Sequence, residues 1–406
     1  MYQSGRHIFI YGDRGVGKSS LAATAAYQYQ SVDAKPIFVS GSIDDTFKTI
    51  IANIANQALG KSRIETRKHH EKIGFSWRGL SLDAGVEISA IDLFSEIQSV
   101  GDATELLKQI AKLHSDKPVV VVDEFDAIRD SSERDKFASL LKQLGDQSVN
   151  IKFIFTGIGK TLEGLLGAHN SIIRQLETIE LSRLSWEGRR EIVLKAADAF
   201  GLAIDDNVNW RIAMVSDGFP YYVQLITEKM LWEAFSEPET VSELGNSQYL
   251  DGLKKSIQSI NAELKRPYEK AVIHRELIYE PIVWATADGY DLDRNLQAIY
   301  ESYKAILNRI NSQDQPLLPR EKFNMHIRRL KSKSYGEILV QVENRQGWYT
   351  YKEKMLRGFV RMQAEANGIQ LLGEKEAPRQ IMHTATNVRT GNYGPRIPKG
   401  IRLRNE

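Results

Sequence analysis

The sequence predicts an α/β protein with a parallel-sheet core, then a helical region, then a smaller domain of helices and a hairpin. Three observations predict this order. A glycine-rich loop at residues 12–20 separates an apolar run from an alanine-rich run, so strand, loop and helix follow one another. Four valines at residues 119–122 lead into acidic residues, as in a buried parallel strand that ends at a ligand site. After residue 185, apolar residues recur three and four apart, and two period-two runs come later.

Length and composition are those of an ordinary globular protein. With 406 residues, 42% hydrophobic and 26% charged, we expect two or three domains with large cores. The absence of cysteine excludes disulfides, zinc–thiolate sites, iron–sulfur clusters and cysteine nucleophiles. No apolar run reaches the length of a membrane span, and the first residues lack the apolar region of a signal peptide. We therefore expect a soluble, cytoplasmic protein without a membrane partner.

Charge is distributed unevenly along the chain, although the net charge is only +2. Residues 311–406 carry 18 Lys and Arg against 9 Asp and Glu, so the last quarter has a net charge of +9 and the rest a net charge of −7. A basic end behind an acidic body suggests a polyanionic partner. A solvated basic tail explains the same asymmetry equally well.

The glycine-rich loop matches GxxxxGK[ST], a pattern that cradles phosphates. Residues 7–11 are the apolar run before it, and residues 20–29 are the helix-favouring run after it. Backbone N–H groups of such a loop point at the phosphates, and the helix N-terminus adds positive dipole. We expect Lys18 to reach the β- and γ-phosphates and the Ser19 hydroxyl to bind Mg²⁺. The predicted nucleotide-binding residues are Gly12, Asp13, Arg14, Gly15, Val16, Gly17, Lys18, Ser19 and Ser20.

The acidic residues after the valine run are candidates for the metal and for the attacking water. Asp123 stands at the carboxyl end of the predicted strand, where open α/β sheets place their ligands. We expect Asp123 to hold Mg²⁺, directly or through water, and Glu124 to polarise the water that attacks the γ-phosphate. The alternative is a pair of surface carboxylates at a strand end.

Two further strands supply weaker candidates. Residues 151–156 end in Thr156, whose hydroxyl could contact the γ-phosphate or the attacking water, or simply close the strand. Arg174 precedes the strand at residues 177–181 and is a candidate arginine finger for the nucleotide of a neighbouring subunit. A surface arginine is an equally good interpretation of Arg174.

With a second strand at residues 36–40, these motifs give the chain a family resemblance. The order of a P-loop strand, a DEFD strand, a hydroxyl-tipped strand and an arginine before the fifth strand resembles the AAA+ ATPases. Within them it is most similar to the replication initiators of the origin-recognition and Cdc6 type, over roughly residues 5–360. The resemblance implies a P-loop AAA+ core with a five-stranded parallel sheet, ATP and Mg²⁺ as cofactors, and a homo-oligomer with ATP between subunits. It divides the chain into a core at 1–184, a helical lid at 185–262, a winged helix-turn-helix domain at 263–372 and a flexible basic tail at 373–406.

The predicted lid departs from the family pattern. Its helices are expected at residues 186–200, 207–216 and 221–235. Before the last of them lies Asp-Gly-Phe-Pro at 217–220, and Tyr221 and Tyr222 stand where the family often has a sensor arginine. The Gly-Phe-Pro element is similar to the GxP of signalling STAND ATPases, which implies Pro220 near adenine; a simple helix start is the alternative. Without the sensor arginine we expect slow, partner-stimulated hydrolysis.

Two other segments differ from the family. Residues 63–95 are predicted to be an inserted region, with a basic stretch at 63–72 and a β-hairpin that turns at residues 83–85. This insertion either contacts DNA or packs on the sheet or the next subunit. About six residues precede the first strand, where relatives usually have an adenine-contacting helix. Either the chain is truncated or its start is misassigned, or Tyr2, His7 or the lid contacts adenine.

The C-terminal region is predicted to fold as a winged helix. Helices are expected at residues 269–287, 293–311 and 320–331, followed by strands at 338–342 and 348–352 around a turn at 344–347. The third helix is basic and can enter a major groove of double-stranded DNA, with the hairpin tip on the phosphate backbone. The predicted DNA-binding residues are Arg320, Lys322, Asn324, Arg328, Arg329, Lys331 and Arg345. Winged helices also bind proteins, which is the alternative.

The leading hypothesis is an ATP-dependent, DNA-binding AAA+ switch that assembles on duplex DNA and is released by hydrolysis. The alternative is a STAND-like signalling or defence ATPase whose winged helix binds a protein partner that the sequence does not identify. The basic helix and tail favour the first hypothesis. The Gly-Phe-Pro element and the missing sensor arginine favour the second.

Overall fold

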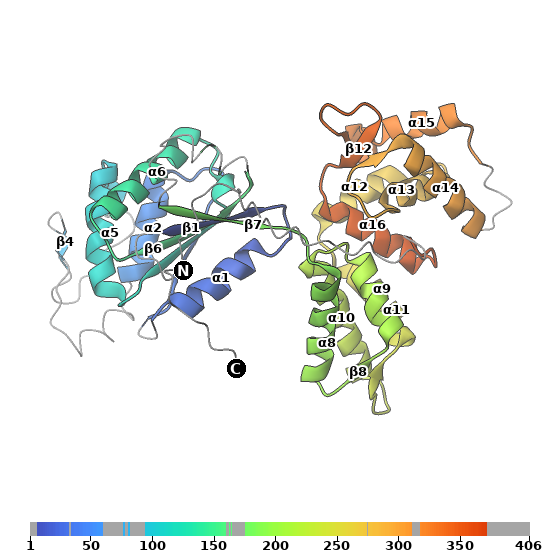
Figure 1. Ribbon diagram of the computed structural model, residues 1–406, viewed down its shortest axis with the longest axis horizontal. Coiled ribbons are helices and arrows are strands. Elements are labelled where there is room, and N and C mark those ends of the chain that lie inside the picture. Colours follow the sequence, from blue (N-terminus) through green and yellow to red (C-terminus); the bar gives the residue numbers. More distant parts are fainter. Residues whose placement is uncertain are drawn as a thin grey trace, which may run out of the picture.

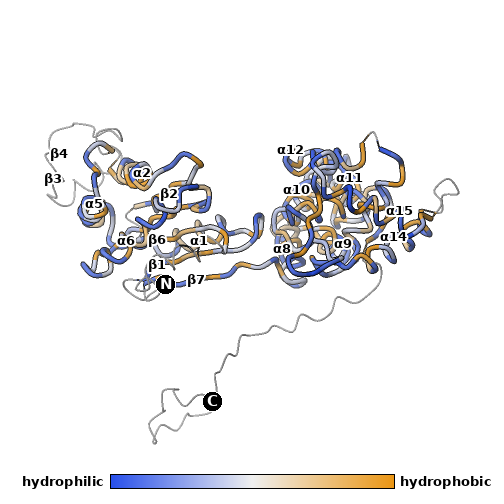
Figure 2. The backbone as a smooth tube through the Cα atoms, turned by 90° about the horizontal axis from the view of Figure 1, so that it is seen from above, coloured by the Kyte–Doolittle hydropathy of each residue, from blue (hydrophilic) through white to orange (hydrophobic). Residues whose placement is uncertain are grey.

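The computed structural model of the chain has two lobes (Figure 1). It describes residues 6–31, 34–59, 76–77, 80–81, 94–159, 162, 164, 175–273, 275–310 and 317–371. One lobe is built on a parallel sheet and the other is mostly helical. The chain passes from the first lobe to the second directly after strand β7 (Figure 2).

Five parallel strands form the core sheet, which confirms the predicted fold class. They are β1 (His7–Gly12), β2 (Ile37–Ser40), β5 (Val119–Asp123), β6 (Lys152–Gly157) and β7 (Leu176–Leu181). Their order across the sheet is β2-β5-β6-β1-β7. Ile10 on β1 is in register with Thr156 on β6, and Val122 on β5 with Phe155 on β6. The carboxyl ends of the three central strands therefore meet at one edge of the sheet.

Helices cover both faces of this sheet because the strands carry apolar residues on alternate sides. On one face, α1 (Lys18–Tyr29) buries Ala22 and Ala26 against Ile8, Ile10 and Val121. On the other face, Phe9, Val120 and Val122 pack with α2 (Phe47–Leu59), α5 (Val100–His114) and α6 (Ser131–Asp146). The 3₁₀ helix η1 (Phe125–Ala127) follows β5 directly.

Two short strands are described within the predicted insertion. Strands β3 (Ser76–Trp77) and β4 (Leu80–Ser81) pair antiparallel, with Trp77 opposite Leu80. The chain therefore reverses between Trp77 and Leu80. The turn predicted at residues 83–85 lies outside the described residues. The basic stretch at 63–72 lies outside the described residues.

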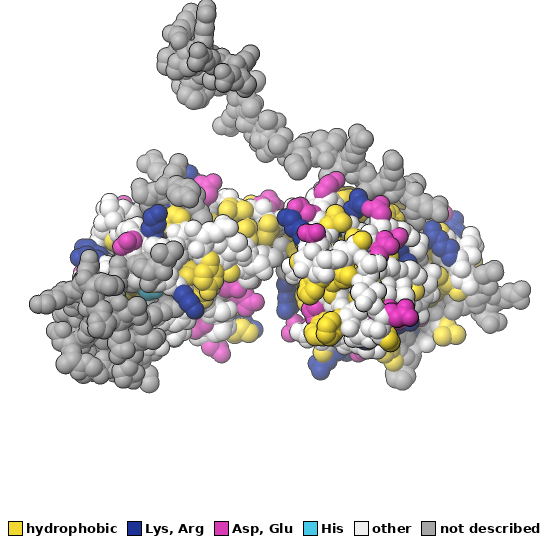
Figure 3. All heavy atoms as spheres, turned by 90° about the horizontal axis from the view of Figure 1, so that it is seen from below, with side chains coloured by type: hydrophobic (Ala, Val, Ile, Leu, Met, Phe, Trp, Pro, Cys, Tyr) yellow, Lys and Arg dark blue, Asp and Glu magenta, His cyan; other side chains and the backbone are white. Residues whose placement is uncertain are grey.

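Four helices follow the core, and we call this region the lid. They are α8 (Trp186–Ala199), α9 (Asp206–Val215), α10 (Pro220–Ser236) and α11 (Asn246–Ser259), with short strands β8 (Ala203–Ile204) and β9 (Glu243–Leu244). The first three lie where the apolar spacing predicted helices, and α11 was not singled out. A groove of about 760 Å³ on the lid is lined by Phe200, Trp232 and Phe235 among others. Hydrophobic side chains gather on this lobe in the view from below (Figure 3).

We call the remaining elements the C-terminal unit. Its helices are α12 (Ala262–Val272), α13 (Tyr279–Ala287), α14 (Leu296–Ile310), α15 (Arg320–Arg329) and α16 (Met355–Ala366), with the 3₁₀ helix η3 (Lys333–Tyr335). Strands β10 (Arg294–Asn295), β11 (Leu339–Gln341) and β12 (Trp348–Tyr351) form an antiparallel sheet in the order β10-β12-β11.

Two sequence predictions for this unit need correction. The helix expected at residues 269–287 is two helices, α12 and α13, because the chain leaves helical geometry at Ile273 and resumes it at Tyr279. The helix expected from residue 293 begins at Leu296, since Arg294 and Asn295 pair with β12 as strand β10. Helix α16 was not singled out by its sequence pattern.

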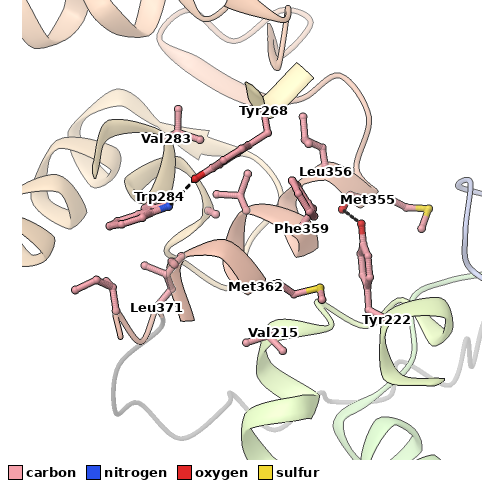
Figure 4. Close-up of a cluster of buried hydrophobic side chains, with 14 of the residues drawn as sticks. Val215, Tyr222, Tyr268, Val283, Trp284, Met355, Leu356, Phe359, Met362 and Leu371 are labelled. Atoms are coloured by element: carbon pink, nitrogen blue, oxygen red, sulfur yellow. Dashed lines mark hydrogen bonds between the residues drawn. The ribbon is translucent and has the colours of Figure 1, made fainter. Parts of the chain in front are cut away.

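The lid and the C-terminal unit share one hydrophobic core. It includes Ile226 and Tyr222 of the lid together with Phe359 and Met362 of α16. The Tyr222 hydroxyl donates to the Met355 carbonyl oxygen at 2.8 Å, and Trp284 Nε1 donates to the Tyr268 hydroxyl at 3.2 Å (Figure 4). Within the described part of the chain, no helix is long and apolar enough to cross a membrane.

Candidate nucleotide-binding site

The glycine-rich loop joins β1 to α1 with the backbone geometry that glycine allows. Gly12, Gly15 and Gly17 have φ angles of 155°, 80° and 97°, which side chains disfavour. A Cβ atom at Gly12 would overlap the Leu181 carbonyl oxygen, so this position also needs glycine for the close approach of β7. Helix α1 begins at Lys18 without a side-chain cap or an acidic residue in its first turn. Its N-terminal N–H groups are therefore suited to an anionic ligand.

Lys18 is held inside the loop. Its Nζ atom donates to the carbonyl oxygens of Gly12 at 3.1 Å and Asp13 at 2.9 Å. Burial lowers the pKa of Lys18, and the carboxylates of Asp126, Asp13, Asp123 and Glu124 act in the opposite direction. The lysine thus stands in a group of carboxylates at the carboxyl edge of the sheet.

The residues predicted to hold the metal lie together. Ser19 Oγ donates to Asp123 Oδ1 at 2.9 Å, and Thr156 Oγ1 donates to the same carboxylate oxygen. A hydroxyl and a carboxylate are the oxygen donors that Mg²⁺ prefers, with water and phosphate oxygens as its remaining ligands. The described residues hold no group of three or more His, Asp or Glu that could bind a metal without other ligands. The Ser19 hydroxyl and the Asp123 carboxylate therefore fit Mg²⁺ whose other ligands come from a nucleotide and water.

Glu124 follows Asp123 in a strained conformation. Its φ and ψ angles are 51° and 41°, in the left-handed region, and its N–H group points to Thr156 Oγ1 at 3.0 Å and Asp123 Oδ1 at 3.1 Å. Non-glycine residues with positive φ cluster at functional sites. Glu124 is exposed, which leaves its carboxylate accessible to water. Thr156 is buried and contacts Asp123 and Glu124, so it positions the acidic pair.

Asp126 is a site residue that sequence reasoning missed. Among the carboxylates it acts most strongly to raise the pKa of Lys18, against the effect of burial. Its Oδ1 atom would lie 3.3 Å from a Cβ atom at Gly157, at the end of β6. The second acid of Asp-Glu-Phe-Asp was the available signal, but only the 3₁₀ turn η1 brings it back to the sheet edge.

Pro220 lies against the loop. It is the first residue of α10, and its Cγ atom would be 3.8 Å from a Cβ atom at Gly17. Three residues earlier, the buried Asp217 carboxylate contacts Arg357 at 2.6 Å, Arg361 at 3.2 Å and Arg183 at 2.8 Å. The start of α10 is thereby tied both to the loop and to α16.

The C-terminal unit also contacts the loop. Lys354 Nζ is 2.7 and 2.9 Å from the two Asp13 carboxylate oxygens. Met355 packs so closely on Gly15 that a Cβ atom there would overlap its sulfur. Val16 is 3% exposed and belongs to the core shared by the lid and the C-terminal unit. Sequence reasoning missed Lys354 and Met355, because nothing in their local pattern refers to a loop 341 residues away.

The remaining candidates either lie outside the described residues or make other contacts. Arg174 lies outside the described residues, as does Tyr2. His7 does not fit the predicted contact with adenine: it is 2% exposed, and its Nδ1 atom accepts from the Phe153 N–H group at 3.1 Å. Its place at the start of a central strand explains this burial. Ser20 is exposed beside Ser19 in the first turn of α1.

The predicted DNA-binding residues fall into two groups. Lys322 and Arg328 on α15 are exposed, as is Arg345 between β11 and β12. The others are half-buried: Arg320 lies over the Tyr300 ring, Lys331 over the Tyr349 ring, and Arg329 donates to the Tyr279 hydroxyl at 3.1 Å, while Asn324 Oδ1 is buried. His326 on the same helix is only 4% exposed and packs edge-on against Tyr279.

Comparisons with known proteins find a family match for the first part of the chain. Residues 2–166 match a family model described as an AAA domain. Similar solved structures include a Walker-type ATPase of Pyrococcus abyssi, with 13% identity, a TM-score of 0.49, and coverage of 88% of this chain and 91% of that one. Cdc6p from Pyrobaculum aerophilum has 15% identity, a TM-score of 0.42 and 89% coverage of both chains. The RuvB Holliday junction branch migration motor of Thermotoga maritima has 12% identity, a TM-score of 0.41 and coverage of 92% and 88%. No curated protein matches the chain.

Proposed function

We propose that the chain, whose residues 2–166 match the model of the AAA domain family, is an ATP-hydrolysing switch that acts on double-stranded DNA. The observation that supports the ATP site is the contact of Ser19 with Asp123 at 2.9 Å, beside Thr156 and Glu124. It joins the phosphate loop to the acidic end of β5. The family resemblance read from the motifs supports the DNA-related role.

We assign each residue of the site a step in hydrolysis. The backbone N–H groups of residues 15–19 and the Lys18 ammonium bind the phosphates. Ser19 and Asp123 would hold Mg²⁺, which would supply positive charge at the phosphate oxygens. Glu124 accepts a hydrogen bond from the water that attacks the γ-phosphate, and Thr156 holds Asp123 and Glu124 in place.

The proposal for DNA uses the exposed part of the C-terminal unit, which we propose is a winged helix. Arg328 and Lys322 project from α15, and Arg345 lies on the turn between β11 and β12. Side chains in this arrangement can neutralise DNA phosphates while a helix occupies the major groove. We further propose that subunits associate around ATP, with Arg174 as a candidate finger.

A signalling ATPase with a protein partner is the second candidate. Pro220 beside Gly17 favours it, since a Gly-Phe-Pro element at the nucleotide site is what the STAND resemblance implies. The two candidates differ in their response to DNA. ATP hydrolysis measured with and without duplex DNA separates them: stimulation supports the first candidate, and an unchanged rate supports the second.

The ATP site is tested by Glu124→Gln and Lys18→Ala. Glu124→Gln should reduce turnover by about 100-fold or more while ATP binding persists, because only the base is lost. Lys18→Ala should abolish measurable binding in calorimetry. Thr178→Ala, an exposed change on β7, is the control and should leave both unchanged. Undiminished turnover in Glu124→Gln would exclude this residue as the base.

A further inference from the structure

Three successive residues of the phosphate loop have partners in the C-terminal unit. Asp13 pairs with Lys354, and Arg14 pairs with Glu263 at 3.0 Å. Gly15 packs against the Met355 sulfur, and Val16 is buried in the shared core. The partners of Asp13 and Gly15, which are Lys354 and Met355, come from the start of α16. Figure 4 labels Met355 at this position. The loop is therefore contacted by Glu263, Lys354 and Met355 of the C-terminal unit.

The Asp13–Lys354 pair affects the charge of the phosphate loop as well as its shape. Asp13 places a carboxylate in a loop whose ligand is a polyanion, and like charges at short range oppose binding. Lys354 contacts both Asp13 oxygens, at 2.7 and 2.9 Å, whereas Lys18 contacts the Asp13 backbone carbonyl at 2.9 Å. Because Lys18 is needed for the phosphates, Lys354 is the cation that neutralises the Asp13 side chain.

Helix α16 is held firmly enough to position these residues. Arg357 donates to both Asp217 oxygens, at 2.8 and 2.6 Å, and Arg361 pairs with the same carboxylate. The Met355 carbonyl accepts from the Tyr222 hydroxyl at 2.8 Å. Asp217 and Tyr222 flank Pro220, which lies against Gly17. The loop, the start of α10 and the start of α16 thus form one connected cluster.

We propose that Lys354 and Met355 are positioning residues of the nucleotide site, supplied by the C-terminal unit. Lys354 neutralises Asp13 beside the triphosphate, and Met355 holds Gly15 in the conformation that presents the loop's N–H groups. This inference rests on the proposed ATP site. It follows that ATP binding and the docking of α16 on the loop favour each other, since coupling between two sites is reciprocal.

The test measures the dissociation constant of Mg-ATP by calorimetry in four proteins: wild type, Lys354→Ala, Asp13→Asn and the double variant. Lys354→Ala should weaken binding about tenfold, because the Asp13 charge is then uncompensated. Asp13→Asn should bind at least as tightly as wild type, and the double variant should recover to within about twofold of Asp13→Asn. The loss in Lys354→Ala should shrink as salt is raised.

Controls distinguish charge from structure. Lys352→Ala removes a lysine two positions away that pairs with Glu337 at 2.7 Å, and it should leave ATP affinity unchanged. Lys354→Arg keeps the charge and should bind like wild type. In steady-state kinetics Lys354→Ala should raise KM about tenfold and keep kcat within about twofold, as expected when ground-state and transition-state binding are lost equally.

Several outcomes would overturn this inference. The first is unchanged or tighter binding of Mg-ATP by Lys354→Ala. The second is an equal loss of Mg-ATP affinity in both single variants without recovery in the double variant, because a purely structural contact predicts that result. Failure of wild type itself to bind Mg-ATP would instead refute the proposed function. Wild-type binding that Lys18→Ala abolishes and Lys354→Ala leaves intact would refute only this inference.

Discussion

Asp217 is the residue on which the connection between the lid and α16 depends. Its carboxylate is 2% exposed and contacts three arginines, two of them on α16. Burial alone would raise its pKa, but Arg357 and Arg361 hold the pKa of Asp217 well below its usual range. Its φ of 53° lies in the left-handed region that aspartate and asparagine tolerate better than most residues. The charge, rather than the backbone, is therefore its main contribution.

Replacing Asp217 by Asn should lower the free energy of unfolding by about 3–5 kcal/mol, because the buried arginines lose their counter-charge. Asparagine keeps the shape and the backbone conformation, so the effect reports charge. Urea denaturation measures it. Asp251→Asn, which breaks an exposed pair with Lys254 at 3.6 Å, is the matched control and should change stability by less than about 1 kcal/mol. An equally small loss of unfolding free energy in both variants would show that the contacts of Asp217 with the arginines do not stabilise the protein.

The buried His7 should make the free energy of unfolding depend on pH. Burial first, and then the nearby Lys152, lowers its pKa to about 3 from 6.5. Because the folded pKa is depressed, protonation favours the unfolded chain: the contribution is complete above pH 6.5 and is lost as the pH falls toward 3. Between pH 6 and 4, wild type should lose about 2 kcal/mol more stability than His7→Gln in urea titrations. If the free energy of unfolding fell equally with pH in wild type and in His7→Gln, this prediction would be contradicted.

At the scale of elements, two adjacent arginines of α15 have different surroundings. Arg328 is exposed, whereas Arg329 donates to the Tyr279 hydroxyl of α13 and joins two helices of the C-terminal unit. The sequence alone treats the two as equivalent because they are adjacent and both lie off the apolar stripe. Their different partners follow from the approach of α13, which the helical period of α15 does not reveal.

If α15 contacts DNA as proposed, Arg328→Ala should reduce the slope of log affinity against log salt by about 1, since one phosphate contact is lost. Arg329→Ala should change the slope less. Fluorescence anisotropy with a labelled duplex measures both. Lys304→Ala on α14, which removes an ion pair with Glu301, is the control and should leave the slope unchanged. An unaltered slope in Arg328→Ala would exclude this side chain from the DNA interface.

At the scale of the whole molecule, the lid has apolar side chains that remain exposed to solvent in the folded protein. Phe235 is 81% exposed and Phe200 70% exposed on the groove. Phe235→Ser should therefore change the free energy of unfolding by less than about 0.5 kcal/mol and should reduce the binding of a hydrophobic dye. Phe137→Ala in the core of the first lobe should instead cost about 3–5 kcal/mol. A large loss of stability in Phe235→Ser would show that the side chain is packed in solution.

The strands of the core sheet lie within one residue of their predicted positions, because strand runs, glycines and apolar spacing are local signals. Lid helices α8, α9 and α10 were predicted for the same reason. The division between α12 and α13, and the strand pairing of Arg294 and Asn295, depend on which segment comes alongside and were predicted wrongly.

The sequence by itself determined the α/β class and the loop that carries Lys18 and Ser19, because each is encoded by residues adjacent in the chain. Only the tertiary structure decided that Asp126 returns to Lys18, that Asp217 is buried among arginines, and that Lys354 meets Asp13 across 341 residues. A periodic pattern specifies which face of an element is apolar, but not which element covers it. That choice is made by the packing of the whole chain.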